Sequence, residues 1–357
     1  MTQSKEEPQF SPDKNIQRGL VSTTSRVIGE YQSQDMAIML AVPGSEIRER
    51  LFESPASRTS FVVAFHTPER EKTIIFPDYS FHLSSVAAGM SVLFGKKLDV
   101  HGLTEHHGRF LTPDVSQYAS LCDPRLRFNS HQPRNAYPVK LVLDEFGAIR
   151  PLFESDEGAA TKLIAAARFY MRSLQSAERD AEVAYLHLIT AGEVLANLFE
   201  YPDSVRLSDE IRSDLALVKK HVPQGCAVVR RLSSVLWGVR RSFVRALTSL
   251  LDSDFYESCD DPPHYRLEQE NIEKHIGAAY DLRSLYLHTG EPFRTAISTG
   301  YVQSFIPGEL DSSNKNLRKA SRDAPTLIGL ERLIRYAILK CMENHEFLGP
   351  RSAVEEG

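Results

Sequence analysis

The chain has 357 residues, of which 42% are hydrophobic and 25% are charged, which is ordinary for a globular protein large enough for two domains. Its formal net charge of −5 argues against a protein that coats nucleic acid indiscriminately, but does not exclude a local basic groove. The four cysteines are widely spaced, which argues against a disulfide framework or a structural zinc site. The polar N-terminus and the lack of a long apolar run predict a cytoplasmic protein that does not enter a membrane.

The first 152 residues have the composition of an arm followed by a strand-rich domain. Residues 1–28 are polar and predict a flexible N-terminal arm. Residues 29–152 alternate short apolar runs with Pro and Gly, which predicts a mixed or mostly β domain with a sensor or regulatory role. The expected strands are 36–42, 60–65, 73–76, 97–101 and 139–144. A short helix is expected at 80–94, where apolar residues recur every three or four positions, and a long loop at 120–138.

Residues 153–348 predict an all-α domain, followed by a C-terminal tail at 349–357. Apolar residues at helical spacing predict six helices, the first two forming an αα-hairpin. These helices are expected at 158–177, 180–199, 207–221, 228–251, 268–289 and 325–344. Residues 252–266 and 294–323 are expected to be loops. The sequence therefore predicts an α+β protein, with strands in the first part and a helical bundle in the second.

An arginine in the helix expected at 268–289 is the most informative residue of the chain. Gly290 and Pro292 predict the end of this helix. Its apolar stripe consists of Ile272, Ile276, Ala279, Tyr280, Tyr286 and Leu287. Arg283 falls near the middle of that stripe, and burying an unpaired guanidinium costs several kcal/mol. Arg283 therefore needs a carboxylate, a subunit interface or an anionic ligand, and Glu193 in the helix at 180–199 is the best candidate carboxylate.

His288 follows five residues later, in the last turn of the same helix. Five residues correspond to a rotation of roughly 140° about a straight helix, so Arg283 and His288 do not share a face. A histidine at this position is also commonly a favourable C-terminal cap. Two interpretations stay open: a structural ion pair with a capping histidine, and a site that handles phosphate.

The surrounding segments resemble the HEPN family, and most closely its Apea-like branch found in prokaryotic defence proteins. The resemblance covers about residues 155–346. It is carried by Phe169-Tyr-Met-Arg-Ser-Leu-Gln175, Leu188-Ile-Thr-Ala-Gly-Glu-Val-Leu195, Tyr280-Asp-Leu-Arg-Ser-Leu-Tyr-Leu-His288 and Leu330-Glu-Arg-Leu-Ile-Arg-Tyr-Ala337. The stretch Ser91-Val-Leu-Phe-Gly-Lys-Lys97, with His101-Gly102, resembles the N-terminal half of proteins with that architecture. Family members often have Asn, Asp or His directly after the arginine, where this chain has Ser284.

The resemblance implies a metal-independent ribonuclease whose Arg-x4-His motifs meet across a homodimer interface. Arg283 and His288 would be the catalytic residues, with Ser284, Tyr286 and Glu193 in support. His288 would act as acid or base, because an imidazole titrates near neutral pH, and Arg283 would hold the phosphate with its planar fork. Cleavage would leave a 2′,3′-cyclic phosphate and a 5′-hydroxyl, with no metal or other cofactor. Pairing two subunits would also overcome the angular offset within one helix.

The sequence contains further polar and charged groups outside the Arg-x4-His segment. Basic residues that can follow an RNA backbone, or that are simply solvated, lie in two groups. They are Arg240 and Arg241 in the helix at 228–251, with Arg230, Arg231 and Arg245, and Lys315, Arg318 and Lys319, with Arg322, in the loop at 294–323. Gly89 and Gly95-Lys96-Lys97 fail the spacing of a phosphate-binding loop. An exposed polar turn, rather than a metal site, is predicted for His101, Glu105, His106 and His107. Trp237 is predicted to lie in the core or at an interface.

The implied partners are an RNA substrate, a second copy of the chain and a regulatory or antitoxin protein, in phage defence or toxin-like growth control. Two alternatives stay open. One is a non-catalytic HEPN module that binds RNA, nucleotide or protein. The other is a sensor protein whose helical half mainly forms a dimer.

Overall fold

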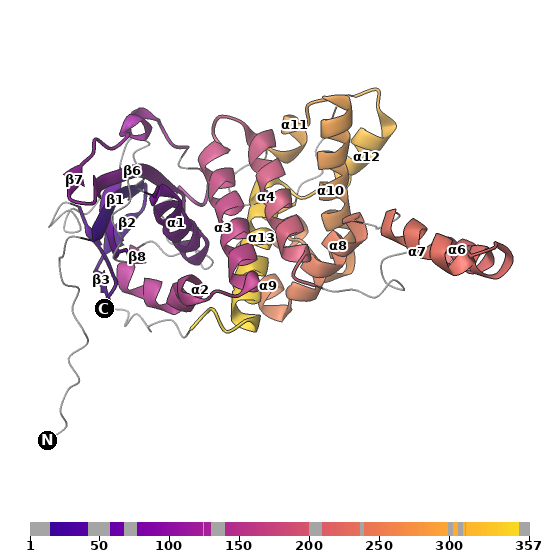
Figure 1. Ribbon diagram of the computed structural model, residues 1–357. Coiled ribbons are helices and arrows are strands. Elements are labelled where there is room, and N and C mark those ends of the chain that lie inside the picture. The colour runs from indigo at the N-terminus through magenta and orange to yellow at the C-terminus, as the bar shows by residue number, and fades with distance from the viewer. Residues whose placement is uncertain are drawn as a thin grey trace, which may run out of the picture.

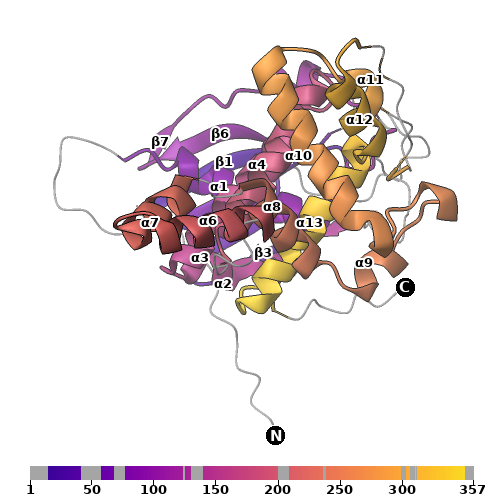
Figure 2. The same ribbon diagram turned by 90° about the vertical axis from the view of Figure 1, so that its right-hand side faces the viewer.

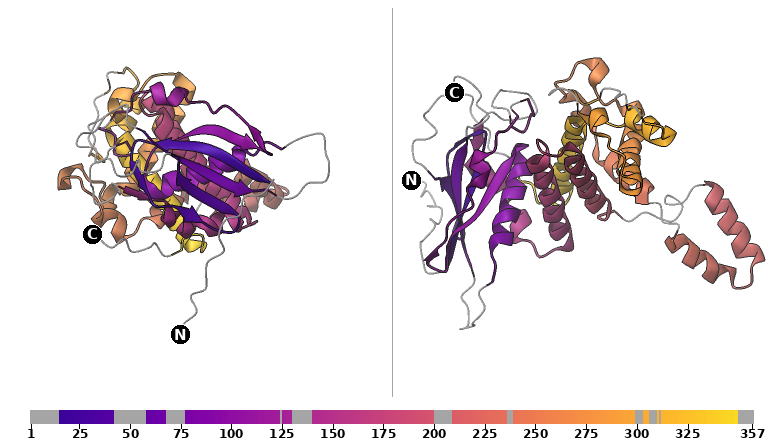
Figure 3. Two further views of the ribbon diagram at one scale, coloured as in Figure 1. Left: turned by 90° about the vertical axis from the view of Figure 1, so that its left-hand side faces the viewer. Right: turned by 90° about the horizontal axis from the view of Figure 1, so that it is seen from above.

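The protein has an α+β fold in which a strand-rich first part packs against a helical second part (Figure 1). The computed structural model describes residues 15–41, 58–67, 77–123, 125–129, 140–199, 209–235, 239–298, 303–305, 310 and 312–349. Viewed from above, the sheet, the helices that cover one of its faces and the helices of the C-terminal part follow one another (Figure 3). In the described part of the chain, no helix combines the length and hydropathy needed to span a membrane.

The main sheet has six antiparallel strands in the order β3-β4-β5-β1-β6-β7. In that order they are Tyr31–Gln32, Met36–Leu40, Thr59–His66, Ile16–Thr23, Leu98–His106 and Arg109–Phe110. A second, two-stranded sheet pairs β2 (Arg26–Ile28) in parallel with β8 (Lys140–Val142). Strands thus form near four of the predicted segments, while the prediction at 73–76 lies outside the described residues.

The predicted flexible arm is wrong from residue 16 onward, because β1 and β2 lie within it. β1 is an inner strand of the sheet, between β5 and β6. Its polar side chains, which resemble those of a solvated arm in the sequence, are buried and hydrogen-bonded. Gln17 donates to Thr67 Oγ1 at 3.5 Å, and Ser22 Oγ lies 2.8 Å from His101 Nε2. Buried polar groups keep their partners in a folded protein, so a polar strand can lie inside a sheet.

Helix α1 (Ser80–Phe94) has the predicted bounds and packs on the sheet. Gly19 of β1 permits this close approach, because a β-carbon there would overlap the side chain of Leu83. The helix ends at Gly95, whose φ of 62° is the left-handed conformation that glycine adopts without strain.

The C-terminal part is a bundle built on the predicted αα-hairpin, with α3 at Gly158–Ser176 and α4 at Ala181–Ala196. Asp180 caps α4 by accepting hydrogen bonds from the backbone N–H groups of Glu182 and Val183. The other α-helices of the described chain are α2 (Arg150–Glu154), α6 (Asp209–His221), α7 (Gly225–Val235), α8 (Val239–Leu250), α9 (Ser253–Glu257), α10 (Ile272–Thr289), α11 (Arg294–Ile297), α12 (Lys315–Asp323) and α13 (Leu327–Asn344). Short 3-10 helices occur at Ser116–Ala119, Leu143–Ile149, Pro263–Tyr265 and Gln269–Asn271.

Three of the helical predictions need correction. The single helix expected at 228–251 is two helices: α7 pairs with α6 in a hairpin that projects from the body, whereas α8 packs against α4 and α10 (Figures 1 and 2). The loop expected at 294–323 contains α11 and α12. Asn314 caps α12 and Leu317 is buried beneath it, a signal that the polar composition hid. The loop expected at 252–266 contains α9.

One continuous hydrophobic core extends from β1 to the end of α13, across the predicted domain boundary near residue 152. Arg335 of α13 connects the helical part to the strand-rich part, because its guanidinium donates hydrogen bonds to the carbonyl oxygens of Val92 and Leu93 at 2.8 Å each. A buried ion pair also connects the two parts: Arg127 Nη2 of the first part lies 2.8 Å from Asp261 Oδ1 of the second.

Candidate functional site

Helix α10 carries the candidate catalytic residues and ends at Gly290, as the sequence predicted, with φ of 71°. Its buried residues are Ile272, His275, Ile276, Gly277, Ala278, Ala279 and Leu282. The predicted stripe is wrong at its C-terminal end, since Leu287 is 57% exposed. No residue of the helix from Arg283 onward is buried, so its last two turns are only partly covered by the rest of the chain.

Arg283 pairs with Glu193 of α4, the partner that the sequence analysis named. Arg283 Nη2 lies 3.2 Å from Glu193 Oε2, and the two side chains are 27% and 20% exposed. The guanidinium also lies over the Tyr280 ring at 5.6 Å. Burial raises the pKa of Glu193, and the charge of Arg283 only partly opposes that shift. The pair is therefore accessible at its edge, and Glu193 is a carboxylate that burial makes easier to protonate.

His288 is exposed and lies on a different side of α10 from Arg283. Helical spacing puts His288 on the side of Ser284 and Asp281, which precede it by one and two turns. Tyr286 packs edge-on against Phe293, with ring centroids 5.4 Å apart. The offset expected from the sequence is thus present, and Arg283 and His288 do not converge within one chain.

A cleft of about 480 Å³ lies between α8, α10 and α12, next to Ser284. Its lining residues are Arg240, Lys274, Ala278, Asp281, Ser284, Leu285, Asn316, Lys319, Ala320 and Asp323. Arg240 forms a two-pronged ion pair with Asp281, Nε to Oδ1 at 2.7 Å and Nη2 to Oδ2 at 2.9 Å. Gly277 makes room for that guanidinium, because a β-carbon there would lie 2.5 Å from Arg240 Nη2.

The structure brings together only some of the basic residues proposed to contact RNA. Arg240 and Lys319 line the cleft, whereas Arg241, Lys315 and Arg318 are exposed but do not line it. The side chains of Arg230 and Arg231, and all of Trp237, lie outside the described residues.

Lys274 and Asn316 line the same cleft, although the sequence did not predict them as site residues. Lys274 Nζ lies 3.0 Å from Asp323 Oδ1. Once α12 is recognised as a helix, Asn316, Lys319 and Asp323 fall on one face at helical spacing.

The cluster expected as an exposed polar turn is instead mostly part of β6. His101 is buried, with Nε2 bonded to Ser22 and Nδ1 2.7 Å from the carbonyl oxygen of Asp114. Lys96 and Lys97, which do not have the spacing of a phosphate-binding loop, are also buried, and Lys96 Nζ donates to the Arg127 carbonyl at 3.1 Å. The described residues contain no group of three or more His, Cys, Asp or Glu placed to hold a metal ion.

Comparisons of the chain with protein-family models, curated proteins and solved structures find no match. A function must therefore be argued from the site and from the sequence motif.

Proposed function

We propose that the protein is a metal-independent endoribonuclease of HEPN type, with a site that two copies complete. The proposal starts from the resemblance of the Tyr280–His288 segment to that family. The observation that carries it is the position of both residues on the poorly covered end of α10, where His288 is exposed and Arg283 is partly exposed.

The chemistry follows from the two side chains. His288 would take the proton of a ribose 2′-hydroxyl or give one to the departing 5′-oxygen. Arg283 would bind the phosphate after exchanging Glu193 for it, which the raised pKa of Glu193 assists. The products would be a 2′,3′-cyclic phosphate and a 5′-hydroxyl.

A second copy is needed because Arg283 and His288 lie on different sides of the helix. A dimer that brings two α10 ends together could place the arginine of one copy beside the histidine of the other. Ser284 would then border the cleft, where Lys319 and the Asp281-paired Arg240 would contact the RNA, and Tyr286 would support the end of α10 through its contact with Phe293. A role in phage defence or growth control, a regulatory or antitoxin partner and a cytoplasmic location belong to the same proposal.

A non-catalytic module that binds RNA, nucleotide or protein is the second candidate. Its specific support is that Glu193 already neutralises Arg283, as a structural ion pair would. The two candidates differ in what the loss of His288 does, because a capping histidine contributes to stability and a catalytic one to cleavage.

The test is incubation of the protein with end-labelled single-stranded RNA in the presence of EDTA. We expect cleavage to cyclic-phosphate ends, and we expect His288→Ala to reduce it by at least about 10²-fold with an unchanged melting temperature. His264→Ala removes another exposed histidine and is the matched control. Cleavage that persists in His288→Ala would contradict the site. Mixing Arg283→Ala with His288→Ala chains should restore activity, because one composite site in each mixed dimer is intact.

A further inference from the structure

Helix α3 carries two arginines without an acidic partner. Arg168 and Arg172 are one helical turn apart, and neither forms an ion pair with a carboxylate in the part of the chain that the structure describes. Burial and the charge of Arg172 both lower the pKa of Arg168. Like charges at this spacing destabilise a helix, so folding alone gives no reason for the pair.

Each of these arginines lies over a phenyl ring. Arg168 Cζ is 4.1 Å from the centroid of Phe81, and Arg172 Cζ is 5.8 Å from that of Phe169. Phe81 belongs to α1, which packs beside α3 (Figure 1), and it is 59% exposed. A single exposed aromatic side chain is common, but here two rings lie against two cations on neighbouring turns of one helix and on the helix beside it.

A histidine completes this surface from the neighbouring helix α4. The ring centroid of His187 is 6.2 Å from that of Phe169. Its Nδ1 atom is buried and has no hydrogen-bond partner of good geometry among the described residues. Burial, and then the charge of Arg172, lower the pKa of His187 by more than a contact with the Arg172 backbone raises it. An anion bound beside Arg172 would offset the effect of the Arg172 charge and so raise the pKa of His187.

We propose that Arg168, Arg172 and His187, with Phe81 and Phe169, bind a single strand of nucleic acid. The guanidinium groups would contact backbone phosphates, and the rings would stack on bases. Cations interleaved with aromatic faces are what a single strand requires, because its bases are free to stack, whereas an acidic peptide would need the charges alone. The surface lies on α1, α3 and α4, outside the cleft of α8, α10 and α12.

This inference rests on the proposed function only in taking RNA as the ligand, and it stands whether or not the RNA is cut. The binding experiment therefore uses the His288→Ala chain, in which cleavage is not expected. The probe is a short fluorescein-labelled oligouridylate in EDTA, followed by fluorescence anisotropy. A labelled polyglutamate of equal length is the comparison ligand.

We expect Arg172→Gln and Phe81→Ala each to weaken oligouridylate binding roughly tenfold. The control Arg125→Gln removes an equal charge from an exposed arginine that is paired with Asp123, and should change the affinity less than about twofold. Arg172 is exposed, so its variant should melt at the same temperature as the parent within a few degrees.

Equal affinity of Arg172→Gln and Arg125→Gln would overturn the proposal. So would polyglutamate binding as tightly as oligouridylate with no loss in Phe81→Ala, which would identify an acidic protein as the partner. Failure of the intact protein to cut RNA would refute the proposed ribonuclease and leave this binding surface unaffected.

Discussion

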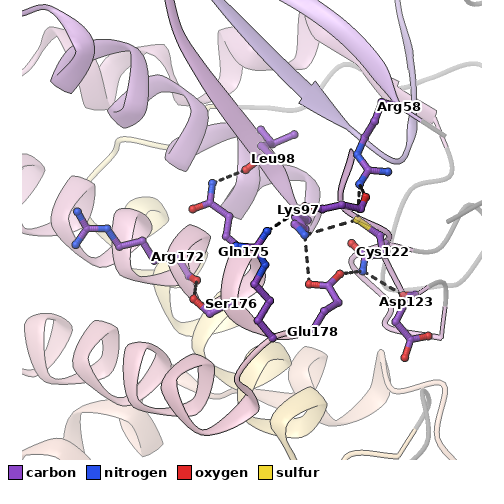
Figure 4. A network of polar contacts seen from close by, with 12 residues as sticks. Arg58, Lys97, Leu98, Cys122, Asp123, Arg172, Gln175, Ser176 and Glu178 are labelled. Carbon is purple, nitrogen blue, oxygen red and sulfur yellow. Dashed lines mark hydrogen bonds and ion pairs between the residues drawn. The ribbon is translucent and has the colours of Figure 1, made fainter. Parts of the chain in front are cut away.

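Two neighbouring regions of the molecule, the C-terminal half of α3 and the residues just beyond its end, differ in how their charges are paired. Just beyond its C-terminal end, Glu178 lies 3.2 Å from Lys97 Nζ and accepts a hydrogen bond from Asn129 at 2.5 Å. Cys122 adds a sulfur 3.6 Å from the same Lys97 Nζ (Figure 4). Earlier in the helix, Arg168 and Arg172 have aromatic neighbours and no carboxylate. Figure 4 shows the guanidinium of Arg172 pointing away from the network.

The contrast separates charges that hold the fold together from charges that are available to a ligand. Burial lowers the pKa of Lys97, but the charges of Asp99 and Glu178 outweigh burial and raise it overall. The charge of Lys97 is thus compensated within the chain, whereas burial raises the pKa of Asp99 despite the nearby charge of Lys97. The Arg168–Arg172 surface has no such compensation, and Arg283 is intermediate because Glu193 neutralises it in a partly exposed position.

The largest loss of stability is expected when a fully buried ion pair is broken. The side chains of Arg127 and Asp261 are both 0% exposed, and Asp261 also accepts a hydrogen bond from the backbone N–H of Ser304. Asp261→Asn should lower the free energy of unfolding by about 3–5 kcal/mol in urea denaturation, because it leaves a buried guanidinium without its counter-charge. Asp123→Asn, at an exposed pair, should cost less than about 1 kcal/mol. Equal losses in the two variants would remove the distinction between scaffold and surface charges.

Replacing a single arginine should change the free energy of unfolding by less, and in opposite directions at Arg283 and at Arg172. Arg283→Gln should lower the free energy of unfolding by about 1 kcal/mol, because Glu193 is left partly buried without its cation. Arg172→Gln should raise it by a few tenths of a kcal/mol, because repulsion from Arg168 is relieved. Urea denaturation at low salt measures both. A loss of stability in Arg172→Gln as large as that in Arg283→Gln would mean that Arg172 also belongs to the scaffold.

The smallest effect concerns the titration of His187, whose pKa burial and Arg172 hold below its usual range. Arg172→Gln should raise that pKa, and so should added oligouridylate in the parent chain, as measured by NMR of the imidazole ring. The depressed pKa also means that His187 stabilises the fold above about pH 6.5, and that this contribution is lost as the pH falls through the folded-state pKa. A His187 pKa that does not respond to Arg172→Gln would show that the two side chains are not coupled.

The sequence predicted the features that depend on local periodicity and failed where polar residues are buried. The bounds of α1, the αα-hairpin and Gly290 at the end of α10 all followed from spacing and caps. β1 was missed because Gln17 and Ser22 look solvated until their partners, distant in sequence, are known. The pairing of Arg283 with Glu193 was predictable, since a charge within an apolar stripe requires a partner.

The Arg168–Arg172 surface was not predictable from spacing. Two arginines one turn apart on a helix are normally a solvated face. Only the packing of α1 beside α3, which brings Phe81 under Arg168, distinguishes this pair. The absence of a carboxylate near them among the described residues is likewise a property of the tertiary fold.

The most direct test of the distinction between paired and unpaired arginines is the salt dependence of oligouridylate affinity. A single-stranded ligand loses about 0.7 in the slope of log affinity against log salt for each phosphate contact that is removed. We predict that Arg172→Gln lowers the slope by about that amount, whereas Arg125→Gln leaves the slope unchanged. Equal slopes for these two variants would contradict the account, because the unpaired arginine would then contact no phosphate.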